Sequence, residues 1–106
     1  MEQDRKFRIL FVEDITRYHT LFADEINSVL PADIQFADRG TKAIEFLNSP
    51  TSHYDLVICD LGLPDIAGDE VVKHMRATPR YDHIPIIILT GDSNQSTQSR
   101  LFSLGA

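Results

Sequence analysis

Four polar side chains that could carry out chemistry stand directly after short apolar runs of the sequence. They are Glu13, Asp14, Asp60 and Thr90. If these runs are neighbouring parallel strands, their carboxyl ends meet at one edge of the sheet and the three carboxylates lie together. Three acids at close range repel one another and raise at least one pKa, unless a cation is bound between them.

A carboxylate cluster of this kind suits a hard metal ion. No histidine adjoins Glu13, Asp14 or Asp60 in the sequence, and Cys59, directly before Asp60, lies inside an apolar run that indicates a buried side chain. Mg²⁺ prefers oxygen ligands and retains some of its water when a protein binds it. We therefore expect Mg²⁺ or Mn²⁺, rather than zinc, at these three side chains.

The apolar runs that precede the four polar side chains indicate buried parallel strands. They are short, rich in β-branched residues and scarcely alternate with polar residues, which is typical of strands covered by helices on both faces. The three runs are Phe7–Val12, Leu56–Cys59 and Ile84–Leu89, and a weaker fourth is Ile34–Ala37.

Helical patterns lie between the predicted strands. Apolar residues recur at helical spacing over Tyr18–Leu30, and further patterns span Gly40–Leu47, Asp69–Arg76 and Asn94–Leu104. This alternation of strand and helix predicts an α/β protein with right-handed crossovers and an open, doubly wound parallel sheet. A binding site of such a fold lies in the crevice beyond the carboxyl ends of the strands.

Composition narrows the class of protein. The 106 residues are 42% hydrophobic and 25% charged, which is the balance of a globular chain that folds as one domain. A formal net charge of −6 argues against direct nucleic acid binding, which depends on Lys and Arg. No apolar stretch approaches the roughly 20 residues of a membrane span, and the charged start Met1–Lys6 does not match a secretory signal. The single cysteine, Cys59, indicates a buried thiol, and we expect a cytoplasmic protein.

Three segments together resemble the response-regulator receiver family of two-component signalling. They are Ile9–Asp14, Asp60–Pro64 with Gly68 further on, and Ile87–Gly91. An acidic pair, a D-x-x-x-P turn with a later glycine, and a threonine after a strand are weak signals singly and specific together. The resemblance runs from Phe7 to the last residue. It implies the flavodoxin-like receiver fold, with the strand order 2-1-3-4-5.

The resemblance also implies how a metal is bound. Asp14 is expected to be a direct metal ligand, and Asp60 contributes to the same site. Glu13 is expected to hold a water molecule of the metal, and Gly62 to offer its backbone carbonyl.

The same resemblance implies phosphorylation of Asp60. This carboxylate is expected to become an aspartyl phosphate, and Thr90 to donate its hydroxyl to a phosphoryl oxygen and act as the switch. Gly91 is expected to leave room for access, and the helix over Asn94–Leu104 to lie near the partner-binding face. A phosphoacceptor of this kind is a signalling module and not an enzyme, with at most slow self-phosphorylation and self-dephosphorylation.

The expected partners are a histidine kinase or a histidine phosphotransfer protein, and a downstream output that the sequence does not name. In the family, a fifth strand that ends in a lysine follows a Gly-Ala pair similar to Gly105 and Ala106. We therefore expect residues 1–106 to form a receiver domain that is incomplete at its C-terminus, with any output domain outside this chain. The fourth strand would then be an exposed apolar edge that is open to self-association.

Other interpretations stay open at this point. Glu13 and Asp14 would also suit the start of a helix, and Asp60 a turn before Pro64. A pseudo-receiver that binds partners without phosphorylation is one alternative function. A metal-dependent phosphohydrolase is another, although such enzymes commonly place a second acid where this chain has Gly62.

Several further residues near the predicted crevice or in the helices receive no role. These are His19, His53, His74, His83, Asp65, Asp69 and Asp92. Gly62 and Gly68 are expected to be turn glycines with positive φ, which would be compatible with either interpretation of the site.

Overall fold

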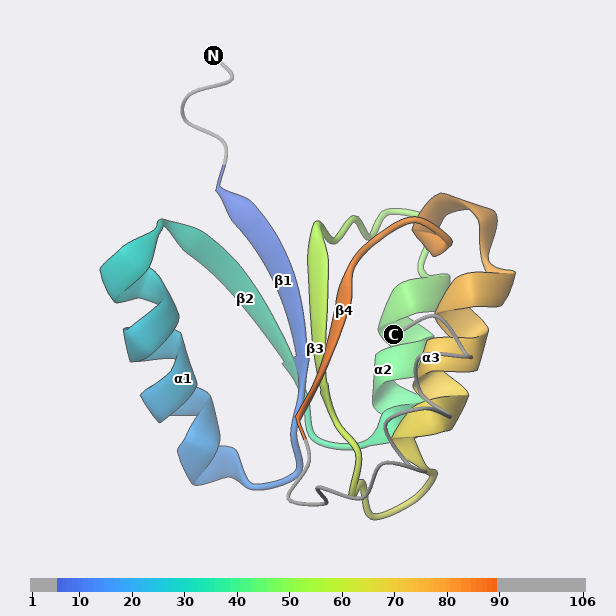
Figure 1. The fold of residues 1–106 in the computed structure, drawn as a ribbon, viewed down its shortest axis with the longest axis horizontal. Helices are drawn as coiled ribbons and strands as arrows, with labels where there is room; N and C mark the ends of the chain where they lie inside the picture. The colour runs from blue at the N-terminus through green and yellow to red at the C-terminus, as the bar shows by residue number, and fades with distance from the viewer. Residues whose placement is uncertain (1–5, 90–106) are drawn as a thin grey trace.

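The computed structural model describes residues 6–89 as alternating strands and helices (Figure 1). The bounds are β1 Phe7–Val12, α1 Thr16–Val29, β2 Ala32–Ala37, α2 Gly40–Asn48, β3 Leu56–Asp60, α3 Gly68–Ala77, the 3-10 helix η2 Pro79–Tyr81, and β4 Ile86–Leu89. The α/β class and the alternation predicted from the sequence are confirmed. The helix predicted over Asn94–Leu104 lies outside the described residues.

The four strands form one parallel sheet in the order β2-β1-β3-β4. This is the predicted order for these strands, and any fifth strand lies outside the part of the chain that the structure describes. Val12 at the end of β1 pairs with Cys59 of β3. The next residues, Glu13 and Asp60, therefore lie at the same level, at the carboxyl edge of the sheet.

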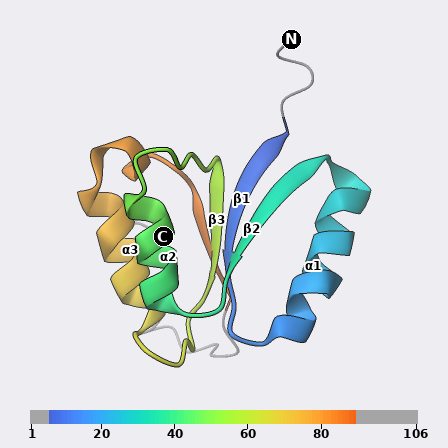
Figure 2. The same ribbon diagram turned by 180° about the vertical axis from the view of Figure 1, so that it is seen from behind.

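The helices cover the two faces of the sheet unequally. Figures 1 and 2 show α1 on one face and both α2 and α3 on the other. Side chains alternate between the faces along each strand, so Leu10 and Val12 pack on the α2 and α3 side, while Ile9 and Phe11 face α1. Both faces of the central strands are apolar for this reason.

The face beneath α1 is thinly covered within residues 6–89. Helix α1 has no buried residue, and Leu21 and Val29 are 60% and 81% exposed. Along β4, Ile87 is exposed while Ile86 is buried, because alternate side chains of this strand point toward α3. The exposed apolar edge predicted for the fourth strand is therefore narrower than expected.

The start of β4 differs from the sequence-based prediction. The apolar run begins at Ile84, whereas the strand begins at Ile86. Pro85 has no N–H for the ladder, although its carbonyl accepts the N–H of Val57 at 3.1 Å. The guanidinium of Arg76 donates to the carbonyl of Ile84 at 2.9 Å, so this residue belongs to the turn after η2.

None of the helices within residues 6–89 combines the length and the apolar character that crossing a bilayer would require. The longest of them, α1, has fourteen residues in which charged and polar side chains are interspersed.

Replacing the buried Met75 of α3 with alanine should weaken the fold. This side chain is fully buried in the larger apolar cluster, and truncation of such a residue costs about 2–5 kcal/mol because it leaves a cavity. Urea unfolding followed by circular dichroism measures the loss. Lys73→Ala is the matched control on the same helix, since its ammonium makes only an exposed 3.5 Å ion pair with Glu70. A loss at Met75 no larger than at Lys73 would show that this core is not tightly packed.

Candidate functional site

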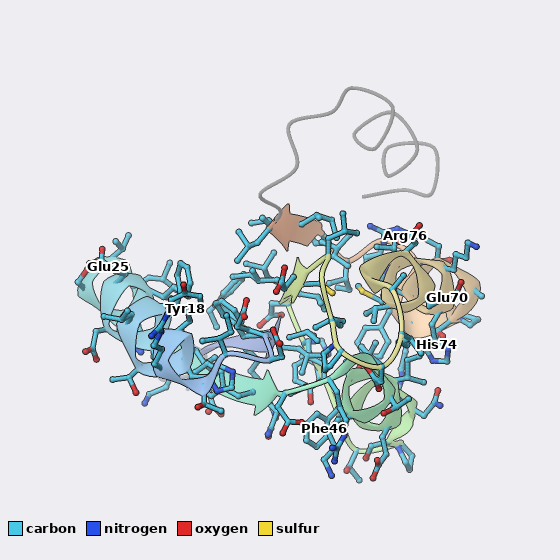
Figure 3. The ribbon with its side chains drawn as sticks, turned by 90° about the horizontal axis from the view of Figure 1, so that it is seen from below. Tyr18, Glu25, Phe46, Glu70, His74 and Arg76 are labelled. Atoms are coloured by element: carbon cyan, nitrogen blue, oxygen red, sulfur yellow. The ribbon has the colours of Figure 1, made fainter. Side chains whose placement is uncertain are left out.

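The carboxyl edge of the sheet brings three acidic side chains together. Glu13, Asp14 and Asp60 each offer a carboxylate oxygen, and these oxygens lie within 4.8 Å of one another. Glu13 and Asp14 follow β1, and Asp60 ends the neighbouring strand β3. Figure 3 views the molecule from this end of the sheet, with Tyr18 of α1 on one side and Glu70 of α3 on the other. The convergence expected from the sequence is present, while the roles of these residues stay predictions.

Glu13 is the buried member of the cluster. It is 4% exposed, and its N–H donates to the carbonyl of Ala37 at the end of β2 at 2.9 Å. Burial raises its pKa to about 7, and the nearby charge of Asp60 adds to the rise, while the N–H of Ile15 opposes it. At neutral pH both the protonated and the charged form of this carboxyl group are therefore present. A bound cation would favour the charged form.

The simpler interpretation of Glu13 as a helix cap is partly correct. Its Oε1 accepts the N–H of Ile15 at 3.1 Å, and Ile15 is the N-cap residue directly before α1. Capping does not explain why this buried carboxylate also meets Asp60 across the sheet. The contact with Ile15 fixes the carboxylate beside the other two acids.

Asp60 is half-buried at the end of β3, where its side chain can be reached from solvent. Its Oδ1 accepts the backbone N–H of Gly62 at 3.2 Å. The preceding Cys59 is fully buried, as predicted. Burial, followed by the charges of Asp60 and Glu13, raises the pKa of this thiol to about 12, so it stays protonated and is no thiolate ligand.

The donor set of the cluster fits a hard divalent cation. Within residues 6–89 it is a group of three acids, with one buried and two half-buried members. Asp14 and Asp60 would hold the ion with their carboxylates, and Glu13 would act from its buried position. Mg²⁺ is the cation that such oxygen ligands prefer. The carbonyl of Gly62 as a further ligand stays a prediction.

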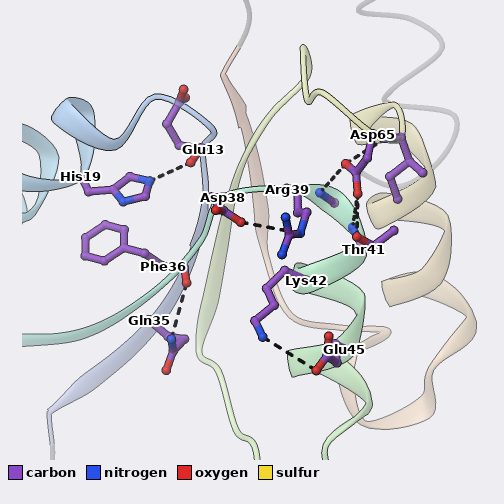
Figure 4. Close-up of polar contacts among 12 residues, drawn as sticks. Glu13, His19, Gln35, Phe36, Asp38, Arg39, Thr41, Lys42, Glu45 and Asp65 are labelled. Atoms are coloured by element: carbon purple, nitrogen blue, oxygen red, sulfur yellow. Dashed lines mark hydrogen bonds and ion pairs between the residues drawn. The ribbon is translucent and has the colours of Figure 1, made fainter.

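His19 contacts the site, although the sequence analysis assigned it no role. Its Nε2–H donates to the backbone oxygen of Glu13 at 2.7 Å, and its ring stacks on Phe36 of β2 with centroids 4.4 Å apart (Figure 4). His19 therefore holds the loop that carries the acidic pair. The available signal was its helical spacing with Phe22 and Ile26, which places a polar ring on the apolar side of α1.

The loop after Asp60 returns closely to the end of β3. The N–H of Gly68 donates to the carbonyl of Leu61 at 3.2 Å. A Cβ on Gly68 would lie 3.0 Å from the backbone carbonyl oxygen of Asp60. Close approach of the backbone therefore favours glycine at this position. Neither Gly62 nor Gly68 has the positive φ predicted from the sequence, so that expectation is wrong.

Thr90 and Gly91, the predicted switch residue and its small neighbour, lie outside the described residues, as does Asp92. Their roles stay predictions. The last described residue, Leu89, pairs in register with Asp60.

Comparison with protein families supports a single assignment for most of the chain. The family model described as the response regulator receiver domain matches residues 9–106. A structure of a phosphorylated cyanobacterial phytochrome response regulator, RcpA, superposes with a TM-score of 0.87 and 25% identity. The match covers 96% of this chain and 77% of that one.

Curated relatives contain the matching segment within longer proteins. A probable cyclic di-GMP phosphodiesterase of Vibrio cholerae is 39% identical over 75 residues, which are 69% of this chain and 16% of that protein. The chemotaxis protein CheV1 of Helicobacter pylori is 30% identical in an alignment of 112 residues, gaps included, that covers 90% of this chain and 35% of that protein. The chain thus spans about a sixth and about a third of these two relatives.

Mg²⁺ should raise the melting temperature of the wild-type chain and not that of Asp14→Ala. An ion that binds only the folded state at ten times its Kd stabilises it by about 1.4 kcal/mol, which is a rise of several degrees for a domain of this size. Thermal unfolding by circular dichroism, with NaCl at equal ionic strength as the control, measures the difference. An equal rise in both proteins would remove Asp14 from the site.

Proposed function

Because the chain belongs to the response regulator receiver domain family, we propose that it is the phosphoacceptor of a two-component phosphorelay. Asp60 accepts a phosphoryl group from the phosphohistidine of a histidine kinase or of a histidine phosphotransfer protein. The change at this site then regulates an output domain or protein. The observation that carries the proposal is the meeting of Glu13, Asp14 and Asp60 within 4.8 Å at the carboxyl edge of the sheet.

The proposed reaction moves one phosphoryl group. A carboxylate oxygen of Asp60 attacks phosphorus, and an O–P bond forms as the N–P bond of the phosphohistidine breaks. The imidazole nitrogen leaves with the electron pair and takes up a proton. A carboxylate is a weak nucleophile, but this transfer depends mainly on positioning and on neutralisation of charge. Bound Mg²⁺ supplies that neutralisation.

The residues around Asp60 support the positioning part of this reaction. The N–H of Gly62 orients one of its carboxylate oxygens, and its half-buried position leaves it accessible to a donor. Glu13 and Asp14 provide the remaining negative charge for the ion. Thr90, in this proposal, donates its hydroxyl to the phosphoryl group after transfer and passes the change to the segment that follows.

The proposal includes the setting of the reaction. Residues 1–106 act as a receiver domain in the cytoplasm, as a signalling module with at most slow self-phosphorylation and self-dephosphorylation. Self-association through β4 remains part of the proposal, with the 48% exposed side chain of Ile87 as its contact. Light scattering on wild type and Ile87→Lys tests this point.

Two alternatives are less well supported. A pseudo-receiver would have no use for three carboxylates held close together, one of them buried. A phosphohydrolase commonly has a second acid two residues after its nucleophile, where this chain has the exposed Gly62. A phosphorylated protein that persists, rather than rapid release of phosphate, separates the proposed function from the second alternative.

Asp60→Asn should abolish phosphate incorporation and leave the fold intact. Asparagine has nearly the same shape as aspartate, and it cannot form the acyl phosphate. Intact mass after treatment with acetyl phosphate and Mg²⁺ detects the added phosphoryl group, and circular dichroism checks the fold. Asp33→Asn, at an exposed position near the start of β2, serves as a control for the change from acid to amide. Undiminished labelling of Asp60→Asn would refute the assignment of the phosphoacceptor.

Thr90→Ala should still accept phosphate and lose the response that follows. The hydroxyl is proposed to sense the phosphoryl group and takes no part in the attack. Amide hydrogen exchange over residues 91–104, with and without a phosphate mimic, measures the response. If the variant responds as the wild type does, Thr90 is not the switch.

A further inference from the structure

The carboxylate of Asp65 links the loop after β3 to the first turn of α2. Its Oδ1 accepts the N–H of Gly40 at 2.8 Å and that of Ile66 at 2.9 Å. Its Oδ2 accepts the N–H of Thr41 at 2.9 Å and the hydroxyl of Thr41 at 2.6 Å. Figure 4 shows the carboxylate of Asp65 directed at Thr41. Two segments more than 20 residues apart are joined by one side chain.

This contact replaces a cap that α2 lacks. The residue before the helix, Arg39, makes no side-chain capping hydrogen bond, and the first N–H groups of a helix need partners from elsewhere. An acidic side chain at a helix N-terminus is favourable. Hydrogen bonds from Thr41, Gly40 and Ile66 hold the pKa of Asp65 well below its usual range. The carboxylate is therefore charged at neutral pH.

The first residue of α2, Gly40, makes room for a side chain of the loop. A Cβ on Gly40 would lie 2.3 Å from Cγ1 of Ile66, so glycine at the start of α2 lets the side chain of Ile66 settle against the helix. Asp65 and Ile66 thus attach the outer part of the loop through polar and apolar contacts together. The contact of Gly68 with Leu61 closes the inner part.

The segment between these attachments adjoins the phosphoacceptor. Gly62 lies between Leu61 and Asp65, and its N–H donates to the carboxylate of Asp60 at 3.2 Å. A Cβ at Gly62 would meet no atom of the described residues within 4 Å, apart from its chain neighbours, so that face of the residue is not packed. Its position depends on how the two ends of the loop are fixed.

We infer that Asp65 is a positioning residue of the phosphoacceptor site, which fixes the loop on α2 and thereby holds Gly62 against Asp60. This inference rests on the proposed function. Loss of Asp65 should weaken Mg²⁺ binding and slow phosphorylation, since both use the carboxylate of Asp60. Partners that orient a metal ligand commonly change affinity by about tenfold or more.

The test is the Kd of Mg²⁺ for the full chain, measured by amide NMR titration at a temperature where each variant is folded. Asp65→Ala should raise the Kd about tenfold. Asp65→Asn, which keeps one acceptor oxygen, should restore part of the affinity. Thr41→Val removes only the hydroxyl donor and should raise the Kd less, with no further effect in the Asp65→Ala background.

Ser52→Ala is the matched control for stability alone. The half-buried hydroxyl of Ser52 forms hydrogen bonds with the Tyr81 hydroxyl at 2.8 Å and the Ser49 carbonyl at 2.9 Å. Ser52 precedes β3 and so lies at the opposite end of that strand from Asp60. Ser52→Ala should lower the melting temperature and leave the Kd of Mg²⁺ unchanged.

Three outcomes would overturn the inference. Wild-type affinity in Asp65→Ala would show that the loop positions itself. An equal rise of the Kd in Ser52→Ala would show that affinity follows stability alone. If Asp65→Ala does not fold, an unchanged Kd in Thr41→Val would be decisive in its place. A wild-type chain that binds no Mg²⁺ would instead refute the proposed function, and this inference with it.

Discussion

Mutual repulsion of three carboxylates is the constraint on which the rest of this structure depends. Oxygens of Glu13, Asp14 and Asp60 lie within 4.8 Å of one another. At an effective dielectric constant of about 20, two full charges at that distance repel by about 3 kcal/mol. That is a large part of the stability of a small domain. Protonation of one carboxyl group or binding of a cation would relieve this repulsion. Burial is the main cause of the raised pKa of Glu13, and the charges of Asp60 and Asp14 add to it.

The apolar sheet holds the acids together against this repulsion. Central strands β1 and β3 are buried on both faces, and their register fixes the level at which Glu13 and Asp60 leave the sheet. Neither acid can move away without breaking hydrogen bonds of the strand ends, including that between Glu13 and Ala37. The free energy of core packing thus maintains a site whose own charges disfavour it.

The sequence was sufficient to predict the strands, the sheet order through the family resemblance, and the acidic cluster, because apolar runs and the residues after them are visible in one dimension. It was insufficient for His19 and Asp65, whose partners include backbone groups outside their own elements, six residues away for His19 and 25 residues away for Asp65. A backbone N–H or carbonyl has no residue type, so such contacts leave no motif. The reason predicted for Gly68, a positive φ, was wrong. Glycine is favoured there because the backbone passes close to Asp60 in the folded chain.

Both acidic loops are fixed by the same neighbour, the junction of β2 and α2. The loop after β1 is attached there through Ala37 and through the stacking of His19 on Phe36, and the loop after β3 through the bonds of Asp65 to the start of α2. The topology explains this: β2 lies beside β1 at the edge of the sheet, while α2 crosses to the face that it shares with α3. The junction of β2 and α2 therefore lies next to both loops. It contributes no carboxylate to the cluster, yet it contacts the loops on both sides of the acidic site and joins them to α2.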